Sequence, residues 1–140
     1  MNKTIDTLLL DLGGVLIDVD YQRTARAFHA LGFDDFEAQF SKAKQTPLFD
    51  RFEVAAISPA EFRDSVRELF RPNLTDREID ACWNAMLGSI PPTRIELVKA
   101  LGQRYRLLLL SNTNAIHVPA FHAIIAQENG IPDFKELFEG

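Results

Sequence analysis

Three consecutive leucines, Leu8 to Leu10, constrain the fold of this 140-residue chain more than any other stretch. An apolar run bounded by turn-forming residues is typical of a strand buried on both faces, as in a parallel sheet with helices on each side. A carboxylate, Asp11, follows the run directly, and Gly13 and Gly14 come next. Because open α/β sheets bind ligands beyond the carboxyl ends of their strands, we expect Asp11 to face a ligand.

A second apolar run repeats this arrangement near the end of the chain. It runs from Leu107 to Leu110 and is followed by the polar stretch Ser111 to Asn114. We therefore predict two core strands, near Ile5–Leu10 and Arg106–Leu110. If these strands are neighbours in one sheet, the carboxylate of Asp11 faces a cluster of hydroxyl and amide groups across one crevice.

Between the two runs the sequence shows only helical patterns. Two capping boxes, Ser58–Glu61 and Thr75–Glu78, mark helix starts, and apolar residues follow each at helical spacing. We predict an all-helical insertion over residues 17–89, flanked by the two parts of an α/β core at 1–16 and 90–140. The residues expected to be buried together in the insertion are Phe62, Val66, Leu69, Phe70, Trp83 and Met86.

Charge and cysteine content limit the partners and the compartment. Twenty acidic and fifteen basic residues give a net charge of −5, which argues against nucleic acid or an anionic membrane as the main partner. The single cysteine, Cys82, excludes an internal disulfide, and its apolar flanks favour a core position over a nucleophilic role. The first apolar run is too short for a signal peptide or a membrane span, so we expect a cytoplasmic protein.

Two motifs carry a resemblance to a known family. The stretch Asp11 to Asp18, Asp-Leu-Gly-Gly-Val-Leu-Ile-Asp, resembles the first motif of the haloacid dehalogenase (HAD) superfamily of hydrolases. The stretch Leu110 to Asn114 resembles its second motif, and the two occur in the family's order. Within the superfamily the chain is most similar to phosphatases with a helical cap inserted after the first motif, including sugar-phosphate phosphatases. The resemblance implies a Rossmann-like parallel sheet with a helical cap.

The resemblance also implies roles for individual residues. Asp11 is expected to be the nucleophile of a Mg²⁺-dependent phosphatase, forming an aspartyl phosphate that water then hydrolyses. The carboxylate of Asp11 and the backbone carbonyl of Gly13 are expected to bind Mg²⁺. Ser111, Asn112 and Gly14 are expected to bind the phosphate of a small phosphorylated metabolite.

Two further residues and two departures from the family pattern complete the candidate site. Asp18 and Tyr21 lie where the chain crosses into the predicted cap, so they are candidates for substrate contact, with hydrogen bonding in the linker as the alternative. Gly13 occupies the position of the general acid and base of the commonest motif, which leaves Asp18, water or the substrate to supply the leaving-group proton. Val15 stands where dehalogenases carry threonine or a similar donor, which weakens the hypothesis of carbon–halogen hydrolysis.

The resemblance covers the earlier part of the family pattern. After Lys135 the sequence has neither the lysine of the third motif nor the acidic pair of the late metal motif. We therefore expect an incomplete sheet, low activity of the isolated chain and self-association through an exposed sheet edge. The alternative functions are a non-catalytic HAD-like binding or assembly protein and a metal-independent dehalogenase.

Overall fold

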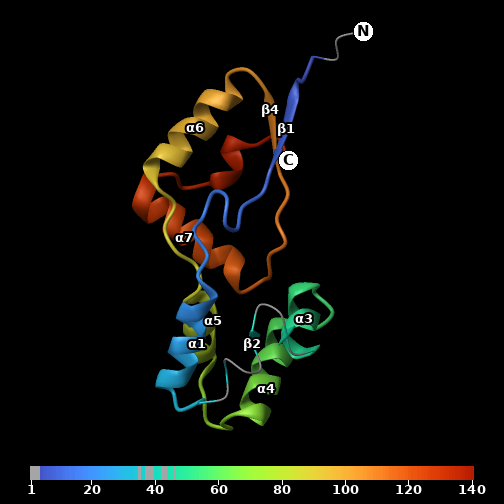
Figure 1. The fold of residues 1–140 in the computed structure, drawn as a ribbon, viewed down its shortest axis with the longest axis vertical. Helices are drawn as coiled ribbons and strands as arrows, with labels where there is room; N and C mark the ends of the chain where they lie inside the picture. Colours follow the sequence, from blue (N-terminus) through green and yellow to red (C-terminus); the bar gives the residue numbers. More distant parts are fainter. Residues whose placement is uncertain (1–3, 35, 37–39, 42–43, 46) are drawn as a thin grey trace. The chain divides into compact units, whose positions relative to one another are not determined.

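The structure, a computed structural model, describes residues 4–34, 36, 40–41, 44–45 and 47–140. Figure 1 shows the order of helices and strands along the chain. Across the described ranges, no helix is both long and apolar enough to cross a membrane.

The chain divides into two compact units. Unit 1 comprises Met1–Val19, Gly88–Ser111 and Ala120–Gly140, and unit 2 comprises Asp20–Leu87 and Asn112–Pro119. Unit 2 thus includes a segment that follows the second motif, in addition to the region predicted to form the cap. The predicted domain division itself stays a prediction.

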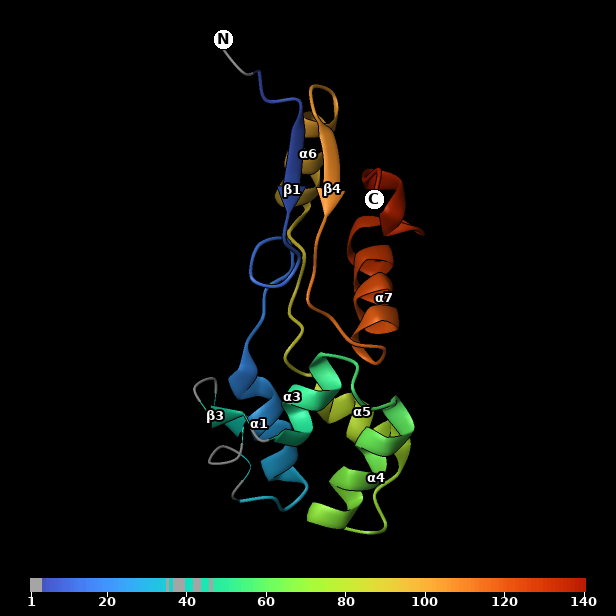
Figure 2. The same ribbon diagram turned by 90° about the vertical axis from the view of Figure 1, so that its right-hand side faces the viewer.

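Unit 1 is built on a parallel pair of strands. β1 (Thr7–Leu10) pairs with β4 (Arg106–Leu109), with Leu8 opposite Leu107 and Leu10 opposite Leu109. The helix α6 (Pro92–Gly102) covers one face of this pair in both views (Figures 1 and 2). On that face Leu107 is buried.

The other face of the strand pair differs from the prediction. We expected β1 to be buried on both faces, but Leu9 is 60% exposed, and Ile5, expected in the strand, precedes it and is 72% exposed. Successive side chains of a strand alternate between the two faces of its sheet, and α6 covers only the face of Leu107. The apolar run therefore predicted the strand correctly. The prediction that both faces of the strand are buried was wrong for the described residues, because the face of Leu9 is exposed.

The remaining elements of unit 1 follow the second motif. The helix α7 (His117–Asn129) enters unit 1 at Ala120, and a 3₁₀ turn, η1 (Phe134–Leu137), follows it. Beyond η1, the N–H of Glu139 donates to the carbonyl of Leu107 at 2.8 Å, and Gly140 accepts from Leu109 at 2.7 Å. These bonds line one edge of β4, whereas the other edge of β1 pairs with no strand in the described part of the chain.

Unit 2 is a helical bundle around aromatic side chains. Its helices are α1 (Tyr21–Ala30), α3 (Pro47–Glu53), α4 (Pro59–Leu69) and α5 (Asp76–Asn84). A short antiparallel pair, β2 (Phe40–Ser41) with β3 (Lys44–Gln45), was not predicted from the helical pattern. The fully buried aromatic side chains are Phe28, Phe36, Phe49, Phe62 and Trp83.

The predicted core of the insertion is largely confirmed. Phe62, Val66, Trp83 and Met86 are buried, but Leu69 is 55% exposed. Leu69 is the last residue of α4, and the ring of the next residue, Phe70, packs against the bundle instead. Phe70 is half-buried and packs against Phe33, with ring centroids 4.5 Å apart. Cys82 is buried as predicted, and burial raises the pKa of its thiol to about 11.

Both predicted capping boxes are present. Ser58 accepts a hydrogen bond from the N–H of Glu61, whose carboxylate accepts one from the N–H of Ser58. Thr75 and Glu78 exchange the same two bonds. Each carboxylate has its pKa lowered, chiefly by the hydrogen bond from the backbone of the capping residue. These local contacts fix where α4 and α5 begin.

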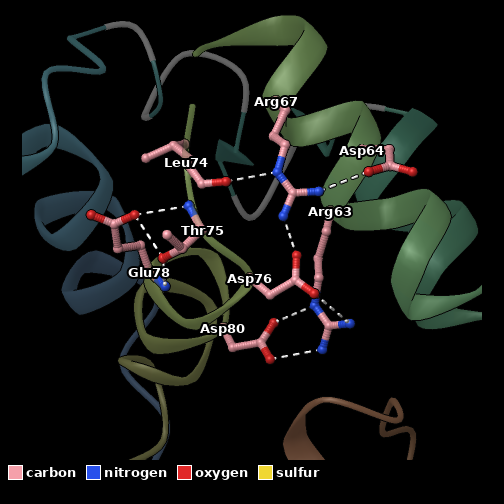
Figure 3. Close-up of polar contacts among 8 residues, drawn as sticks. All are labelled: Arg63, Asp64, Arg67, Leu74, Thr75, Asp76, Glu78 and Asp80. Atoms are coloured by element: carbon pink, nitrogen blue, oxygen red, sulfur yellow. Dashed lines mark hydrogen bonds and ion pairs between the residues drawn. The ribbon is translucent and has the colours of Figure 1, made fainter. Parts of the chain in front are cut away.

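Two arginines on α4 tie this helix to α5 and the loop before it (Figure 3). Arg63 donates two parallel hydrogen bonds to Asp80, both at 2.8 Å. Arg67 donates to the carbonyl of Leu74 at 2.7 Å and pairs with Asp76. Both guanidinium groups thus have hydrogen-bond partners within unit 2. We therefore interpret this charged cluster as stabilising the packing of α4 against α5 rather than as a ligand site.

Candidate active site

The loop after β1 is held by its own backbone. The carbonyl of Leu12 accepts hydrogen bonds from the N–H groups of Leu16 at 2.9 Å and Ile17 at 3.0 Å, and these three side chains are buried. Gly14 closes the loop by donating to the carbonyl of Ile17 at 2.8 Å. Buried leucine and isoleucine side chains therefore anchor a loop whose polar atoms remain at the surface.

Asp11 is the exposed carboxylate of this loop. It follows the last residue of β1 directly, and its Oδ1 accepts a hydrogen bond from the N–H of Leu12 at 2.7 Å. That bond fixes one carboxylate oxygen and leaves the other without a hydrogen-bond donor among the described residues. An oriented, solvent-accessible carboxylate is suited to nucleophilic attack or to metal binding.

The two glycines after Asp11 have different roles. Gly14 has φ +73°, a conformation that glycine adopts at little cost, and a Cβ there would meet nothing within 4 Å. Backbone conformation, not space, therefore requires glycine at this position. Since the Gly14 N–H is bonded to Ile17, it is not available to phosphate in this conformation, contrary to the expected role. Both the N–H and the carbonyl of Gly13, by contrast, have no hydrogen-bond partner among the described residues.

The donor set fits part of a magnesium site. Mg²⁺ in proteins is usually bound by one or two carboxylates together with phosphate oxygens and water. Asp11 has an exposed carboxylate and Gly13 a carbonyl oxygen without a hydrogen-bond partner among the described residues, and their binding of Mg²⁺ stays a prediction. No group of three or more metal-binding side chains lies within the part of the chain that the structure describes. The residues of this loop therefore fit part of a Mg²⁺ shell, one carboxylate and one carbonyl oxygen.

Ser111 lies at the same end of the strand pair as Asp11. The N–H of Leu110 donates to the carbonyl of Leu10 at 2.9 Å, so the parallel register continues to the last residue before each polar group. Ser111 is half-buried. Asp11 and Ser111 therefore follow neighbouring strands at the same end of the strand pair, because parallel strands end at one edge.

Asn112 and Tyr21 belong to unit 2, whereas Asp11 and Ser111 belong to unit 1, so the arrangement described for Asp11 and Ser111 does not include them. Asn112 is exposed. Tyr21 begins α1 and is half-buried, and burial, with a smaller effect of Glu53, raises the pKa of its phenol. Their contact with phosphate or substrate stays a prediction.

Asp18 is part of a crossing between two chain segments of unit 1. Its Oδ1 accepts a hydrogen bond from Arg94 at 2.8 Å, and Arg94 also donates to the carbonyl of Leu16 at 3.2 Å. Gly88 donates to the Asp18 carbonyl at 2.7 Å, and a Cβ at Gly88 would lie 2.9 Å from that oxygen. These contacts favour the linker role for Asp18. No sequence motif marks Arg94, its partner 76 positions away.

His117, for which the sequence favours a helix-capping or surface position over catalysis, is buried in the structure. His117 is 7% exposed, and its Nδ1 lies 2.8 Å from Oδ1 of Asn84. Its ring stacks on Trp83, with centroids 5.3 Å apart and planes 3° from parallel. Burial lowers the pKa of His117 to about 4, so the imidazole is neutral near pH 7. A partner 33 positions away leaves no pattern in the sequence; the only available signal was the apolar flank of Ile116 and Val118.

The chain is similar in sequence and in structure to known proteins. No family model matches the sequence. Over 110 residues, 79% of the chain, it is 31% identical to a D-ribitol-5-phosphate phosphatase of Bacteroides thetaiotaomicron, and it spans about half (53%) of that curated relative. It resembles the crystal structure of a HAD family enzyme of the same organism, an aspartate-to-alanine mutant in complex with magnesium and inorganic phosphate. In that comparison the TM-score is 0.84 and the identity 36%, covering 97% of this chain and 67% of the other.

A second solved structure extends the likeness to another organism. It is a predicted HAD-like family hydrolase from Porphyromonas gingivalis, with a TM-score of 0.78 and 27% identity. The match covers 96% of this chain and 64% of that structure. Both solved structures thus match nearly all of this chain and about two thirds of their own length.

Proposed function

Because the chain belongs to the haloacid dehalogenase family of hydrolases, we propose that it is a Mg²⁺-dependent phosphatase of a small phosphorylated metabolite. The observation that carries the proposal is the exposed carboxylate of Asp11 at the end of β1, with Ser111 at the same end of β4. The relatives named as a phosphatase and as a magnesium and phosphate complex support it. Sugar and alditol phosphates are the favoured substrate class.

Asp11 is the proposed nucleophile. One of its carboxylate oxygens attacks phosphorus, a P–O bond to Asp11 forms, and the ester P–O bond breaks to release the alcohol. Water then attacks the aspartyl phosphate, which releases inorganic phosphate and restores the carboxylate. The hydrogen bond from the Leu12 N–H holds Oδ1 in place and so orients the attacking group.

The phosphate is proposed to bind through the Ser111 hydroxyl, Asn112 and one backbone group of the first loop. In this conformation the backbone donor is the free N–H of Gly13, since the N–H of Gly14 is bonded to Ile17. Donors fixed before the reaction stabilise the charge that develops on the phosphoryl oxygens. Mg²⁺, held by the Asp11 carboxylate and the Gly13 carbonyl, would offset the repulsion between the carboxylate and the phosphate.

The leaving-group proton has a different source from that of the commonest family motif. Gly13 has no side chain to donate it, and Arg94 holds Asp18 Oδ1 at 2.8 Å. Water or a hydroxyl of the substrate is therefore the favoured proton donor. Tyr21 remains a candidate for substrate contact.

Turnover of an aryl phosphate and a panel of alditol phosphates, with and without Mg²⁺, tests the proposal. Asp11→Asn is expected to abolish turnover, because the amide has nearly the same shape but is not nucleophilic. Asp6→Asn, which changes an exposed carboxylate before β1, is the matched control and is expected to have no effect. If the Asp11→Asn variant turned over substrate as fast as the native protein, Asp11 would not be the nucleophile.

The same measurements separate the alternative functions. Phosphate binding without turnover of any substrate would favour the non-catalytic binding or assembly protein. Release of halide from a 2-haloacid in the absence of Mg²⁺ would favour the dehalogenase. The exposed Val15 in the first loop offers no side-chain hydrogen-bond donor for such a reaction.

Self-association is proposed as a further property of the chain. The outer edge of β1 pairs with no strand in the described residues, and Leu9 beside it is 60% exposed. An unpaired edge with apolar neighbours offers backbone groups to a second chain. We therefore propose homo-oligomer formation through this edge, with neither nucleic acid nor membrane as a partner.

A further inference from the structure

The segment after the second motif is fixed inside unit 2 by its own side chains. Asn114 is buried, and its Oδ1 accepts hydrogen bonds from the N–H groups of Ile116 at 3.1 Å and His117 at 3.0 Å. Its carbonyl accepts from the N–H of Val118 at 3.1 Å. Asn114 therefore caps N–H groups at the start of α7, and the side chain of Ile116 beside it in the sequence is 4% exposed.

His117 joins this turn to the end of α5. Because Oδ1 of Asn84 can only accept, Nδ1–H of His117 is the donor in this pair, at 2.8 Å, and the ring lies flat on Trp83. Trp83 is itself held, because its carbonyl accepts a hydrogen bond from the buried hydroxyl of Thr24 on α1 at 3.1 Å. The turn that starts at Asn114 is thus connected by side chains to two helices of the bundle.

The second ring nitrogen of His117, Nε2, makes the burial of this side chain energetically unfavourable. Nε2 is fully buried and has no hydrogen-bond partner among the described residues. Leaving a buried polar atom unpaired is unfavourable, and a leucine or phenylalanine at this position would avoid it. A histidine here is explained by what its other nitrogen does, which is to bind Asn84.

We propose that His117 and Asn84 are positioning residues that hold the backbone of Asn112 in place for phosphate. Asn112 lies two residues before Asn114, so fixing the turn at Asn114 restricts the conformations open to Asn112. This inference rests on the proposed role of Asn112 in phosphate binding. Anchoring before the ligand arrives reduces the ordering that phosphate binding would otherwise require.

Binding of inorganic phosphate in the presence of Mg²⁺ tests the proposal in variants of Asn84. Asn84→Ala removes the acceptor for His117 and is expected to weaken phosphate binding on the order of tenfold, the effect of losing one hydrogen bond. Asn84→Asp keeps an acceptor at this position and is expected to bind phosphate within about twofold of the native protein. Asn129→Leu is the matched control, since it removes a half-buried amide bonded at 3.0 Å to the carbonyl of Ile90 in unit 1.

Two measurements on the same variants complete the experiment. Hydrogen exchange at the amides of Ile116, His117 and Val118 reports whether the turn is anchored, and we expect faster exchange in Asn84→Ala than in Asn84→Asp. Fluorescence of Trp83, the single tryptophan of the chain, reports on its stacking with His117 during the phosphate titration. If Asn84→Ala does not fold, His117→Gln removes the stacked ring and is expected to weaken phosphate binding similarly.

The outcomes separate the inference from the proposed function. Phosphate affinity equal to that of the native protein in Asn84→Ala, with faster exchange in the turn, would show a purely structural contact and overturn the inference alone. Absence of phosphate binding by the native protein would overturn the proposed function, and the inference with it. Weaker binding in Asn84→Ala that Asn84→Asp restores supports the inference.

Discussion

Acidification is expected to destabilise the folded chain through His117. An unperturbed histidine has a pKa near 6.5, whereas burial lowers the pKa of His117 to about 4 in the folded state. Below pH 6.5 the unfolded chain takes up a proton that the folded chain excludes, so unfolding becomes more favourable. The stabilisation is therefore complete above pH 6.5, is lost as the pH falls, and is exhausted near pH 4.

The size of this effect follows from the two pKa values. A shift of one pKa unit corresponds to about 1.4 kcal/mol, which gives a maximum loss of about 3 kcal/mol at low pH. Between pH 7.5 and pH 5, the expected loss from this one residue is about 2 kcal/mol. Solvent screening does not reduce this figure greatly, because the side chain is 7% exposed.

Urea unfolding followed by Trp83 fluorescence measures the loss at a series of pH values. His117→Gln should be less stable near pH 7 but should lose about 2 kcal/mol less between pH 7.5 and pH 5 than the native chain. His29→Gln is the control, because it removes an exposed histidine ring, whose Nε2 lies 3.2 Å from Asp34. Carboxylates that titrate in this range contribute equally to each protein and cancel. Parallel pH profiles for the native chain and His117→Gln would refute the reasoning.

Three other outcomes are expected. Ser111→Ala should lower turnover by ~10²–10³-fold, the usual effect of losing one fixed donor to a developing oxyanion, and an unchanged rate would exclude Ser111 from the phosphate site. Phe62→Ala should lower the free energy of unfolding by ~3–5 kcal/mol, because the ring is fully buried, whereas Leu69→Ala, at an exposed position, should cost less than about 1 kcal/mol in the same urea experiment. Light scattering should detect self-association of the native chain, and Leu9→Lys should reduce it, since a charge beside the β1 edge opposes strand pairing; a monodisperse native monomer would contradict the edge model.

The sequence alone was sufficient for features that depend on neighbouring residues. The Leu8 to Leu10 run and the Asp11 that follows it determined a strand and a carboxylate at its end. The capping boxes at Ser58 and Thr75 determined where α4 and α5 begin, because each box closes within four residues. The motif order also identified the family correctly, since both motifs are short and contiguous.

Tertiary structure decided every feature that depends on a distant partner. Leu8 and Leu9 lie next to each other in the same run of leucines. Leu9 is nevertheless exposed, because α6 covers the opposite face of the strand pair. Arg94 and Asp18 are 76 positions apart in the sequence, and the hydrogen bond between them favours a linker role for Asp18 over substrate contact. The sequence favoured a capping or surface position for His117, because its buried contact is with Asn84, 33 positions earlier. Local patterns encode hydrogen bonds within a turn, whereas burial and pKa depend on atoms that only folding brings together.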